Sequence, residues 1–345
     1  MGGWSKQVCR NIQRRDSVKK MLVTGGAGFI GSEFIRQQAG NDKIILIDKL
    51  TYAGDMRRLK NVEEQITFYR GDVADRKFME HVFNKEKPKT VIHFAAESHV
   101  DRSILDSDPF TITNILGTQI LLDMAIKTEV EKFIHISTDE VYGELGKDGI
   151  FKEGMPLKPN SPYSATKASA ELLVRAYYRT HKLPSIIIRP SNNYGPYHYP
   201  EKFIPLIISN LLEGKPIPVY GKGEQIRDWL YTGDCCRGIN TILRKGKPGE
   251  IYNLGGKSEY TNLDVAGKII NLLGKDETYI KFVHDRPGHD FRYALDNSKA
   301  EELGWKLSVS FEEGLKRTVE WYKENQWWWK PIKSKLKRES KGFWT

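Results

Sequence analysis

The sequence predicts an α/β protein with a doubly wound parallel sheet and a smaller, interleaved C-terminal lobe. The first observation is a series of short apolar runs that alternate with helical patterns, at residues 21–24, 43–48, 66–70, 90–94, 133–136 and 185–189. Such runs are typical of strands that are buried on both faces of a parallel sheet. The second observation is a change in texture after residue 190, where glycine, asparagine and proline become frequent. We therefore expect a second lobe there, from which residues 250–254 return as a strand to the sheet.

The net charge of +10 lies at the two ends of the chain. Residues 1–20 and 323–345 each carry a net charge of +5, and the body from 21 to 322 is formally neutral. A nucleic-acid-binding protein carries its basic residues on the folded surface, so we expect no nucleic acid as a partner. No apolar run approaches the roughly 18–20 residues that span a bilayer, and the N-terminus lacks the apolar core of a signal peptide. We therefore expect no membrane contact either.

Cysteine usage points to a reducing compartment. Cys9, Cys235 and Cys236 have neither the spacing of metal ligands nor that of a disulfide framework. We therefore expect a cytoplasmic protein without a metal site.

A glycine-rich turn follows the first strand. The apolar run 21–24 leads into Gly25, Gly28 and Gly31, and a helical pattern begins there. In this context glycines let the backbone approach a pyrophosphate, which the free N–H groups and the dipole of the helix stabilise. The next strand ends at Asp48, whose carboxylate can accept hydrogen bonds from the adenosine ribose and would repel a 2′-phosphate. The pattern predicts a Rossmann-type domain that binds NAD in preference to NADP.

Two further strand ends belong to the predicted cofactor site. Asp72 and Val73 follow the strand 66–70 and are suited to a contact with the edge of adenine. His99 lies just beyond the next strand and is a candidate general base. We favour the alternative that loop hydrogen bonds hold His99 in place, because the pair Tyr163 and Lys167 already supplies a base.

That pair lies beyond a polar run at the end of the central strand. The run contains Thr138, Asp139 and Glu140, at the edge where open α/β sheets carry out chemistry. Tyr163 and Lys167 follow after a glycine- and proline-rich connection, and their spacing of four places them on one face of a predicted helix. A cation beside a phenol lowers the pKa of the phenol and makes it a usable base near neutral pH.

The second lobe carries groups suited to a nucleotide diphosphate. Lys202, Arg227 and Arg292 are candidates to neutralise the phosphates, and Tyr220 can stack on a nucleobase. Each is an ordinary surface or structural residue when taken alone. As a group, beside a domain that binds a cofactor and needs a substrate, they predict a nucleotide-sugar site.

These observations divide the chain into four parts. They are a basic N-terminal extension over 1–19, a NAD-binding Rossmann domain over 20–190, a substrate lobe over 191–326 with segments that return to the sheet, and a basic, tryptophan-rich tail over 327–345.

The glycine pattern, the Tyr163/Lys167 pair and the order of the lobes resemble the extended short-chain dehydrogenase/reductases. Six segments are similar, more narrowly, to the dTDP-glucose 4,6-dehydratases, at residues 95–103, 137–143, 191–197, 200–205, 225–231 and 285–293. The resemblance covers about residues 20–322. Related epimerases lack the Asp-Glu pair that follows Thr138 here, so the resemblance points to the dehydratases.

The resemblance implies a bound NAD that borrows a hydride and returns it, so that dTDP-glucose becomes dTDP-4-keto-6-deoxyglucose. It implies that Tyr163 takes the proton of the sugar C4 hydroxyl and that Thr138 orients the C4 oxygen. Lys167 would lower the tyrosine pKa and hold the nicotinamide ribose. Glu140 would remove the C5 proton, and a protonated Asp139 would donate to the departing C6 hydroxyl.

The resemblance also implies contacts, residue by residue. The expected NAD contacts are Gly25, Gly28, Phe29, Ile30, Gly31, Asp48, Lys49, Leu50, Thr51, Asp72, Val73, Phe94, Ala95, Ala96, Ser98, Thr113, Tyr163, Lys167 and Asn193. The expected substrate contacts are Ser98, Thr138, Asn192, Lys202, Phe203, Pro218, Tyr220, Arg227, Asn262, Asp285, His289 and Arg292. Family members are homodimers joined through two long helices, which correspond to residues near 109–127 and 161–181. One departure is Cys235, since many members carry histidine after the residue equivalent to Asp234.

Two alternatives stay open at this point. Another nucleotide-sugar 4,6-dehydratase or a 4-epimerase of the same family would share NAD, Tyr163 and Lys167. The adjacent Asp139 and Glu140 argue against an epimerase, which needs no acid/base pair for elimination between C5 and C6. The alternative of a different class is a non-catalytic NAD-binding or nucleic-acid-binding protein, and a complete catalytic set argues against it.

Overall fold

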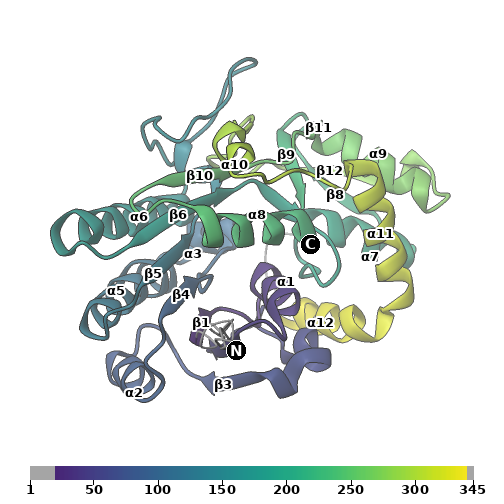
Figure 1. Ribbon diagram of the computed structural model, residues 1–345. Helices are drawn as coiled ribbons and strands as arrows, with labels where there is room; N and C mark the ends of the chain where they lie inside the picture. The colour runs from purple at the N-terminus through teal and green to yellow at the C-terminus, as the bar shows by residue number, and fades with distance from the viewer. Residues whose placement is uncertain (1–19, 340–345) are drawn as a thin grey trace, which may run out of the picture.

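A parallel sheet forms the centre of the computed structural model, which describes residues 20–339 (Figure 1). Within these residues the sheet has seven strands in the order β10-β6-β5-β4-β1-β2-β3, and all neighbouring strands are parallel. The strands are β1 Lys20–Thr24, β2 Lys43–Asp48, β3 Ile66–Arg70, β4 Thr90–His93, β5 Lys132–Ile136, β6 Ser185–Pro190 and β10 Ile251–Leu254. The predicted doubly wound parallel sheet is confirmed, and β10 is the strand expected to return from the second lobe. The extension expected over 1–19 and the end of the tail, 340–345, lie outside the described residues.

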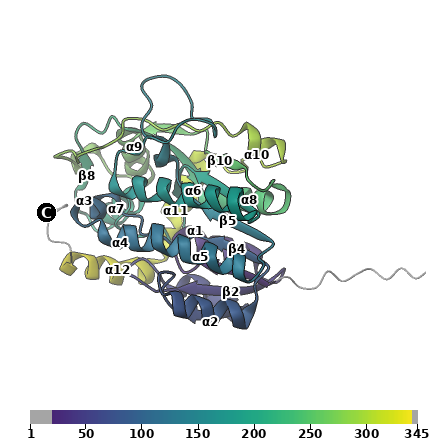
Figure 2. The same cartoon turned by 90° about the vertical axis from the view of Figure 1, so that its left-hand side faces the viewer.

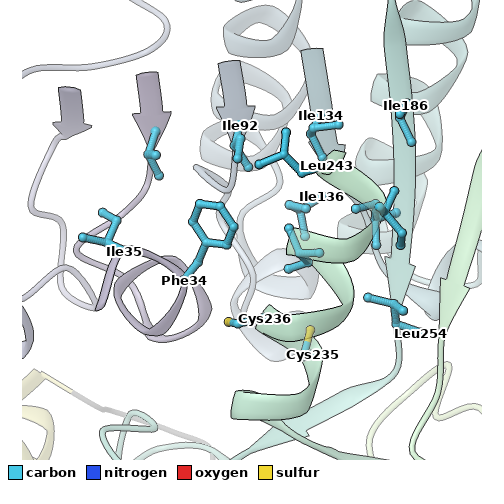
Figure 3. Packing of buried hydrophobic residues seen from close by; sticks show 14 of the residues in the cluster. Phe34, Ile35, Ile92, Ile134, Ile136, Ile186, Cys235, Cys236, Leu243 and Leu254 are labelled. Carbon is cyan, nitrogen blue, oxygen red and sulfur yellow. The ribbon is translucent and has the colours of Figure 1, made fainter. Parts of the chain in front are cut away.

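Helices cover both faces of the sheet, which explains why its strands are apolar on both sides. Side chains of α1 and α8 pack with one face of the strands in a shared core that includes the buried thiols of Cys235 and Cys236 (Figure 3). Side chains of α2, α5 and α6 pack on the other face. These helices are α1 Phe29–Gln38, α2 Arg76–Glu86, α5 Gly117–Lys127, α6 Pro162–His181 and α8 Thr232–Lys245. Burial on both faces is the physical reason that the sequence shows continuous apolar runs instead of alternation.

The expected helix near 109–127 is continuous but not regular. It is preceded by the short helix α3 Val100–Leu105, from which the non-helical residues 106–107 separate it. It begins in the short helix α4 Asp108–Phe110, passes through a π-helical segment at Thr111–Leu116 and continues as α5. The side chain of Asn114, inside that segment, accepts from the Glu97 backbone N–H and donates to Thr166 of α6, at 2.9 Å each. A π segment widens one turn, and such segments occur frequently at functional sites. Apolar periodicity alone does not distinguish it from an α-helix.

The second lobe consists of small sheets and helices that stand over one edge of the main sheet (Figure 1). A three-stranded sheet has the order β11-β9-β7, and β12 pairs with β8. The strands are β7 Asn192–Tyr194, β8 Ile217–Tyr220, β9 Ile226–Tyr231, β11 Glu259–Thr261 and β12 Ile280–Val283. The helices of this part of the chain are α7 Phe203–Leu212, α9 Asn262–Leu272, α10 Ser298–Glu302 and α11 Phe311–Glu324.

Much of the tryptophan-rich tail is a helix, α12 Gln326–Glu339, that packs back on the molecule. Figures 1 and 2 both place α12 along the lower side of the molecule, next to α1 and the 3-10 helix η1 Met56–Gln65. Trp328 and Trp329 have no exposed surface, whereas Trp327 is half exposed. The burial of two indole rings explains why an apolar triplet stands in a basic segment.

No helix within residues 20–339 combines the length and the apolar composition that crossing a membrane requires.

Candidate active site

A cavity of about 430 Å³ lies where the chain order of the sheet reverses between β1 and β4. Open α/β sheets bind ligands at this position, because the loops of the two neighbouring strands diverge there. Residues of both lobes line the cavity. They include all five predicted catalytic residues and most of the predicted cofactor and substrate contacts.

The glycine-rich turn forms a close backbone cradle at one end of the cavity. Gly25 has φ 70°, and a Cβ atom there would lie 2.4 Å from the backbone nitrogen of Ala95. A Cβ atom on Gly31 would lie 2.5 Å from the Gly25 carbonyl oxygen. Helix α1 begins at Phe29, and among the described residues no side chain caps its N-terminus at Gly28. Its first N–H groups can therefore donate to phosphate oxygens, which fits a dinucleotide.

Asp48 lies at the end of β2 and holds this cradle in place. Its Oδ2 atom accepts from the Ala27 N–H at 2.9 Å, and its Oδ1 atom accepts from the Leu50 N–H at 2.8 Å. Burial raises the pKa of Asp48, while these two N–H groups act in the opposite direction. A carboxylate oxygen has more than one acceptor position, so Asp48 can bind the loop and a ribose hydroxyl together.

The polar run after β5 forms a short 3-10 helix, η3 Asp139–Tyr142, that Thr138 caps. The Thr138 hydroxyl accepts from the Glu140 N–H at 3.3 Å and donates to Asp139 Oδ1 at 3.2 Å. This turn places three consecutive side chains on the wall of the cavity.

The surroundings of Asp139 favour its protonated form. Its side chain is buried, and its Oδ2 atom has no hydrogen-bond partner among the residues that the structure describes. Burial raises the pKa of Asp139 well above the usual range, and the carboxylates of Glu140 and Asp228 raise it further. A neutral buried carboxyl group can act as a proton donor.

Glu140 has different neighbours from Asp139. Burial raises its pKa, but the guanidinium groups of Arg286 and Arg227 favour the carboxylate and oppose this shift. A carboxyl group whose pKa is moderately raised is suited to general-base catalysis. The two adjacent carboxyl groups are therefore suited to opposite roles.

Tyr163 and Lys167 lie in the first turns of α6, opposite this wall. A capping box between Ser161 and Ser164 fixes the start of the helix. The Tyr163 backbone N–H donates to Ser103 Oγ at 3.2 Å, and the Lys167 ammonium donates to the Ile136 carbonyl oxygen at 2.7 Å. The last contact anchors Lys167 to the end of β5, directly before the catalytic turn.

The electrostatics of Tyr163 differ from the expectation that Lys167 lowers its pKa. Burial raises the pKa of Tyr163, and the carboxyl groups of Glu140 and Asp139 raise it further, whereas its contact with Thr138 lowers it. Burial also lowers the pKa of Lys167 to about 8. Desolvation and the two carboxyl groups thus determine the direction of the shift for Tyr163, because all these groups share one buried site.

The comparisons with known proteins show the family of the chain. A family model described as GDP-mannose 4,6 dehydratase matches residues 22–318. A dTDP-glucose 4,6-dehydratase of Escherichia coli (strain K12) is 48% identical over 345 residues, with 91% of this chain and 96% of the relative covered. The chain belongs to the dTDP-glucose 4,6-dehydratase family. A relative from Streptomyces niveus with the same name is 45% identical, with 91% and 96% covered.

Solved structures of this family share the fold. The dTDP-glucose 4,6-dehydratase DesIV from Streptomyces venezuelae, solved with NAD and TYD bound, matches with a TM-score of 0.88 at 47% identity over 91% of this chain and 99% of that one. A UDP-glucose 4-epimerase from Thermus thermophilus, in complex with NAD, matches with a TM-score of 0.84 at 30% identity over 88% and 99%. The cradle described above and the NAD bound in DesIV agree on the cofactor.

The second lobe brings several of the predicted substrate residues to the cavity. The Lys202 ammonium donates to the Ser98 carbonyl oxygen at 3.0 Å and so bridges the lobes. Arg227, in β9, donates to the Asp290 carbonyl oxygen at 3.0 Å. The predicted contacts that line the cavity are Gly25, Gly28, Phe29, Ile30, Gly31, Asp48, Lys49, Thr51, Asp72, Val73, Phe94, Ala95, Ala96, Ser98, Thr113, Thr138, Tyr163, Lys167, Asn192, Asn193, Lys202, Phe203, Tyr220, Arg227, Asn262 and His289.

Four predicted contacts lie outside the lining of the cavity: Leu50, Pro218, Asp285 and Arg292. Arg292 forms an ion pair with Glu259, with its Nε atom 2.5 Å from Oε2, so its charge is already matched. Asp285 supports the cavity from behind, because its Oδ1 atom lies 2.6 Å from Nδ1 of His289, which does line the cavity. Matching a motif residue by residue does not distinguish a side chain that faces the ligand from one that holds its neighbour.

Sequence reasoning missed Arg286, which lines the cavity and pairs with Asp101 at 3.1 Å. Its place between two predicted residues, Asp285 and His289, was the available signal. Because its charge favours the Glu140 carboxylate, Arg286 and not Arg292 is the cation of this segment that acts on the site.

His99 is a poor base in this site. It lines the cavity, but burial lowers its pKa to about 2, and the nearby charges of Lys202, Arg102 and Arg286 act in the same direction. This agrees with the prediction that another group supplies the base. The predicted loop hydrogen bonds of His99 are not present: its Nδ1 atom has no partner among the described residues, and its Nε2 atom lies 3.7 Å from Oε2 of Glu201.

Proposed function

We propose that this chain is a dTDP-glucose 4,6-dehydratase, a hydro-lyase that forms dTDP-4-keto-6-deoxyglucose. The observation that carries the proposal is the pair at the end of β5, facing Tyr163: burial favours the neutral form of Asp139, and two arginines favour the carboxylate of Glu140 against the effect of burial. Elimination of water needs a proton removed at one carbon and a proton delivered to the leaving oxygen at the next. An adjacent acid and base supply both.

NAD, held by the glycine cradle and Asp48, supplies the acceptor that takes a hydride from the sugar and later returns it. Tyr163 takes the proton of the C4 hydroxyl, and Thr138 holds the C4 oxygen. Lys167 stabilises the phenolate that results, since an ammonium close to a phenolate favours its charged form.

The ketone formed at C4 acidifies the hydrogen at C5. Glu140 removes this proton, and Asp139 protonates the C6 hydroxyl as it leaves as water. Lys202, Arg227 and Arg286 provide the positive charge that a diphosphate requires.

The proposal is tested by incubating the protein separately with dTDP-glucose, UDP-glucose and GDP-mannose and analysing the products. We expect a 4-keto-6-deoxy product from dTDP-glucose and little conversion of the other two. Conversion of GDP-mannose alone would assign the chain to another 4,6-dehydratase activity.

A 4-epimerase is the competing function, since an epimerase of similar fold matches at 30% identity. In the same experiment an epimerase would return a sugar inverted at C4 and no keto product. The buried acid at Asp139 favours the dehydratase, because epimerisation leaves the C6 hydroxyl in place.

We also infer that the chain acts as a homodimer through the helical run 108–127 and α6, which Figure 2 shows side by side on one face. Large apolar side chains are exposed there, with Ile112 49%, Leu116 41% and Leu172 56% accessible. Light scattering should give twice the mass of one chain, and Leu172→Glu should shift the protein towards a monomer. A monomeric parent protein would contradict the inference.

A further inference from the structure

A buried arginine connects two loops of the cofactor site. Arg58, in η1, is 2% exposed and lines the cavity. Its Nη1 atom donates to the Ala27 carbonyl oxygen in the glycine-rich turn, at 2.8 Å, and to the Ala53 carbonyl oxygen in the loop after β2, at 2.6 Å. A buried guanidinium must keep such partners, because an unpaired buried charge is strongly destabilising.

The other half of the same guanidinium reaches the second lobe. Its Nε and Nη2 atoms both donate to the Tyr197 carbonyl oxygen, at 3.2 and 3.1 Å. Tyr197 has φ 64°, a left-handed conformation that is uncommon outside glycine and needs support from its surroundings. Tyr197 lies between Asn193, a predicted NAD contact, and Lys202, a predicted substrate contact. Arg58 therefore joins the two halves of the site through backbone atoms.

The C-terminal helices hold this junction from outside. The guanidinium carbon of Arg58 lies 5.2 Å from the ring centroid of Trp328 in α12. The Tyr197 ring packs against Trp321 at 4.5 Å and against Trp328 at 5.4 Å between centroids. Arg58, Tyr197, Trp321 and Trp328 therefore form one contiguous group.

A neighbouring contact follows the same path. The ring of His198 stacks on Phe29 of α1, with centroids 4.2 Å apart, and the Tyr322 hydroxyl donates to the His198 carbonyl oxygen. The segment 195–201 thus lies between the start of the cofactor helix and α11. A shift of this segment on substrate binding would therefore move the cofactor loops, and a shift of the cofactor loops would move this segment.

We propose that Arg58 is a positioning residue that couples NAD binding to nucleotide-sugar binding. The inference rests on the proposed function for the identity of the two ligands. Arg58 holds the glycine-rich turn and the Tyr197 backbone in one arrangement, so that a ligand which orders one side stabilises the other. By linkage, bound nucleotide then tightens NAD binding, and bound NAD tightens nucleotide binding by the same factor. We expect the tighter NAD complex to release NAD more slowly.

The test measures the rate at which the holoenzyme releases labelled NAD into an excess of unlabelled NAD, with and without saturating dTDP. In the parent, dTDP should slow the release about 5-fold or more. Arg58→Met removes all four hydrogen bonds, so release without dTDP should be about 10-fold faster, and dTDP should no longer slow it.

Arg58→Lys separates positioning from simple stability. One ammonium can keep the contacts with Ala27 and Ala53, but it cannot also make the two-atom contact with Tyr197. Its release rate without dTDP should stay within about threefold of the parent, whereas the effect of dTDP should be lost. Arg57→Met is the matched control, because Arg57 is the residue just before Arg58, has a side chain that is 42% exposed and pairs only with Asp55 among the acidic residues that the structure describes. It should change neither rate by more than about twofold.

Parental slowing by dTDP in Arg58→Lys would overturn the inference, even if the variant melts at a lower temperature. Equal acceleration by Arg58→Met and Arg57→Met would overturn it too, as would a parent whose NAD release does not respond to dTDP. A parent that responds to dTDP but does not convert dTDP-glucose would instead contradict the proposed function.

Discussion

Asp139 and Glu140 are adjacent in the sequence, and their surroundings give them different chemistry. Asp139 is buried, and the carboxylates of Glu140 and Asp228 lie near it, so its neutral form is favoured. The positive charges of Arg286 and Arg227 act on Glu140 and favour its carboxylate, which opposes the effect of burial. Their separation into an acid and a base depends on neighbours that lie far away in the chain.

Substitution of each carboxyl group should stop the reaction at a different point. Glu140→Gln removes the base for the C5 proton but leaves Tyr163, so oxidation at C4 should proceed and C5 should not exchange with solvent deuterium. Asp139→Asn keeps the base, so C5 should exchange while water is not eliminated. Positioned acids and bases each contribute roughly 10²–10⁴-fold, so both variants should be slow. Mass spectrometry of the recovered sugar measures the exchange.

Exchange at C5 in Glu140→Gln as fast as in the parent would show that another group is the base. The low pKa of His99, about 2, makes His99 an unsuitable replacement. Tyr163 would then be the next group to substitute.

For the same Asp139→Asn variant we also predict how the free energy of unfolding depends on pH. The folded pKa of Asp139 lies well above its usual value of 3.8, so the parent loses stability as pH rises from about 3.8 through the folded pKa. Asparagine resembles the neutral acid and does not ionise. The variant should therefore become more stable relative to the parent as pH rises.

Urea unfolding of both proteins at several pH values from 4 to 8 measures this difference, and groups that are common to both proteins cancel. A difference in the free energy of unfolding that stays constant with pH would contradict the assignment of a neutral Asp139.

At the scale of elements, α12 shows how a segment outside the family model, which ends at residue 318, becomes part of the core. Trp329 has no exposed surface, and its Nε1 atom donates to the Tyr322 carbonyl oxygen at 2.8 Å. Trp329→Ala should lower the free energy of unfolding by about 3–5 kcal/mol. Trp327→Ala is the control, because Trp327 is 53% exposed, and it should cost less than about 1 kcal/mol.

Denaturant unfolding followed by the remaining tryptophan fluorescence measures both variants. Equal losses for Trp329→Ala and Trp327→Ala would mean that α12 does not pack on the lobe in solution.

At the scale of the whole molecule, residues of both lobes line the cavity, and the proposed reaction uses the cofactor twice in one turnover. Purified protein should therefore carry bound NAD, and turnover of dTDP-glucose should produce no net NADH. Absorbance of free NADH during the reaction provides the measurement, with product analysis in parallel. Formation of one NADH for each sugar converted would indicate an ordinary dehydrogenase and contradict the proposed function.

Much of the fold could be predicted because it depends on local patterns. Strands such as β2 are apolar throughout since both faces are buried, and the glycine turn needs residues without a Cβ atom wherever they stand. The catalytic residues were predictable for a similar reason, because a strand end and a helical spacing of four already bring Thr138, Tyr163 and Lys167 to one edge of the sheet.

The sequence by itself determined the fold class, the cofactor and the residues that we propose as catalytic, since each of these follows from a short-range pattern. Only the tertiary structure decided what depends on distant neighbours. It placed Arg286 in the cavity and Arg292 against Glu259, and it gave Tyr163 a raised pKa, because the charge and burial around a side chain come from segments that the chain order does not reveal. It also decided that Trp328 of the tail packs on Arg58 and Tyr197, a contact between residues more than a hundred positions apart that no local pattern predicts.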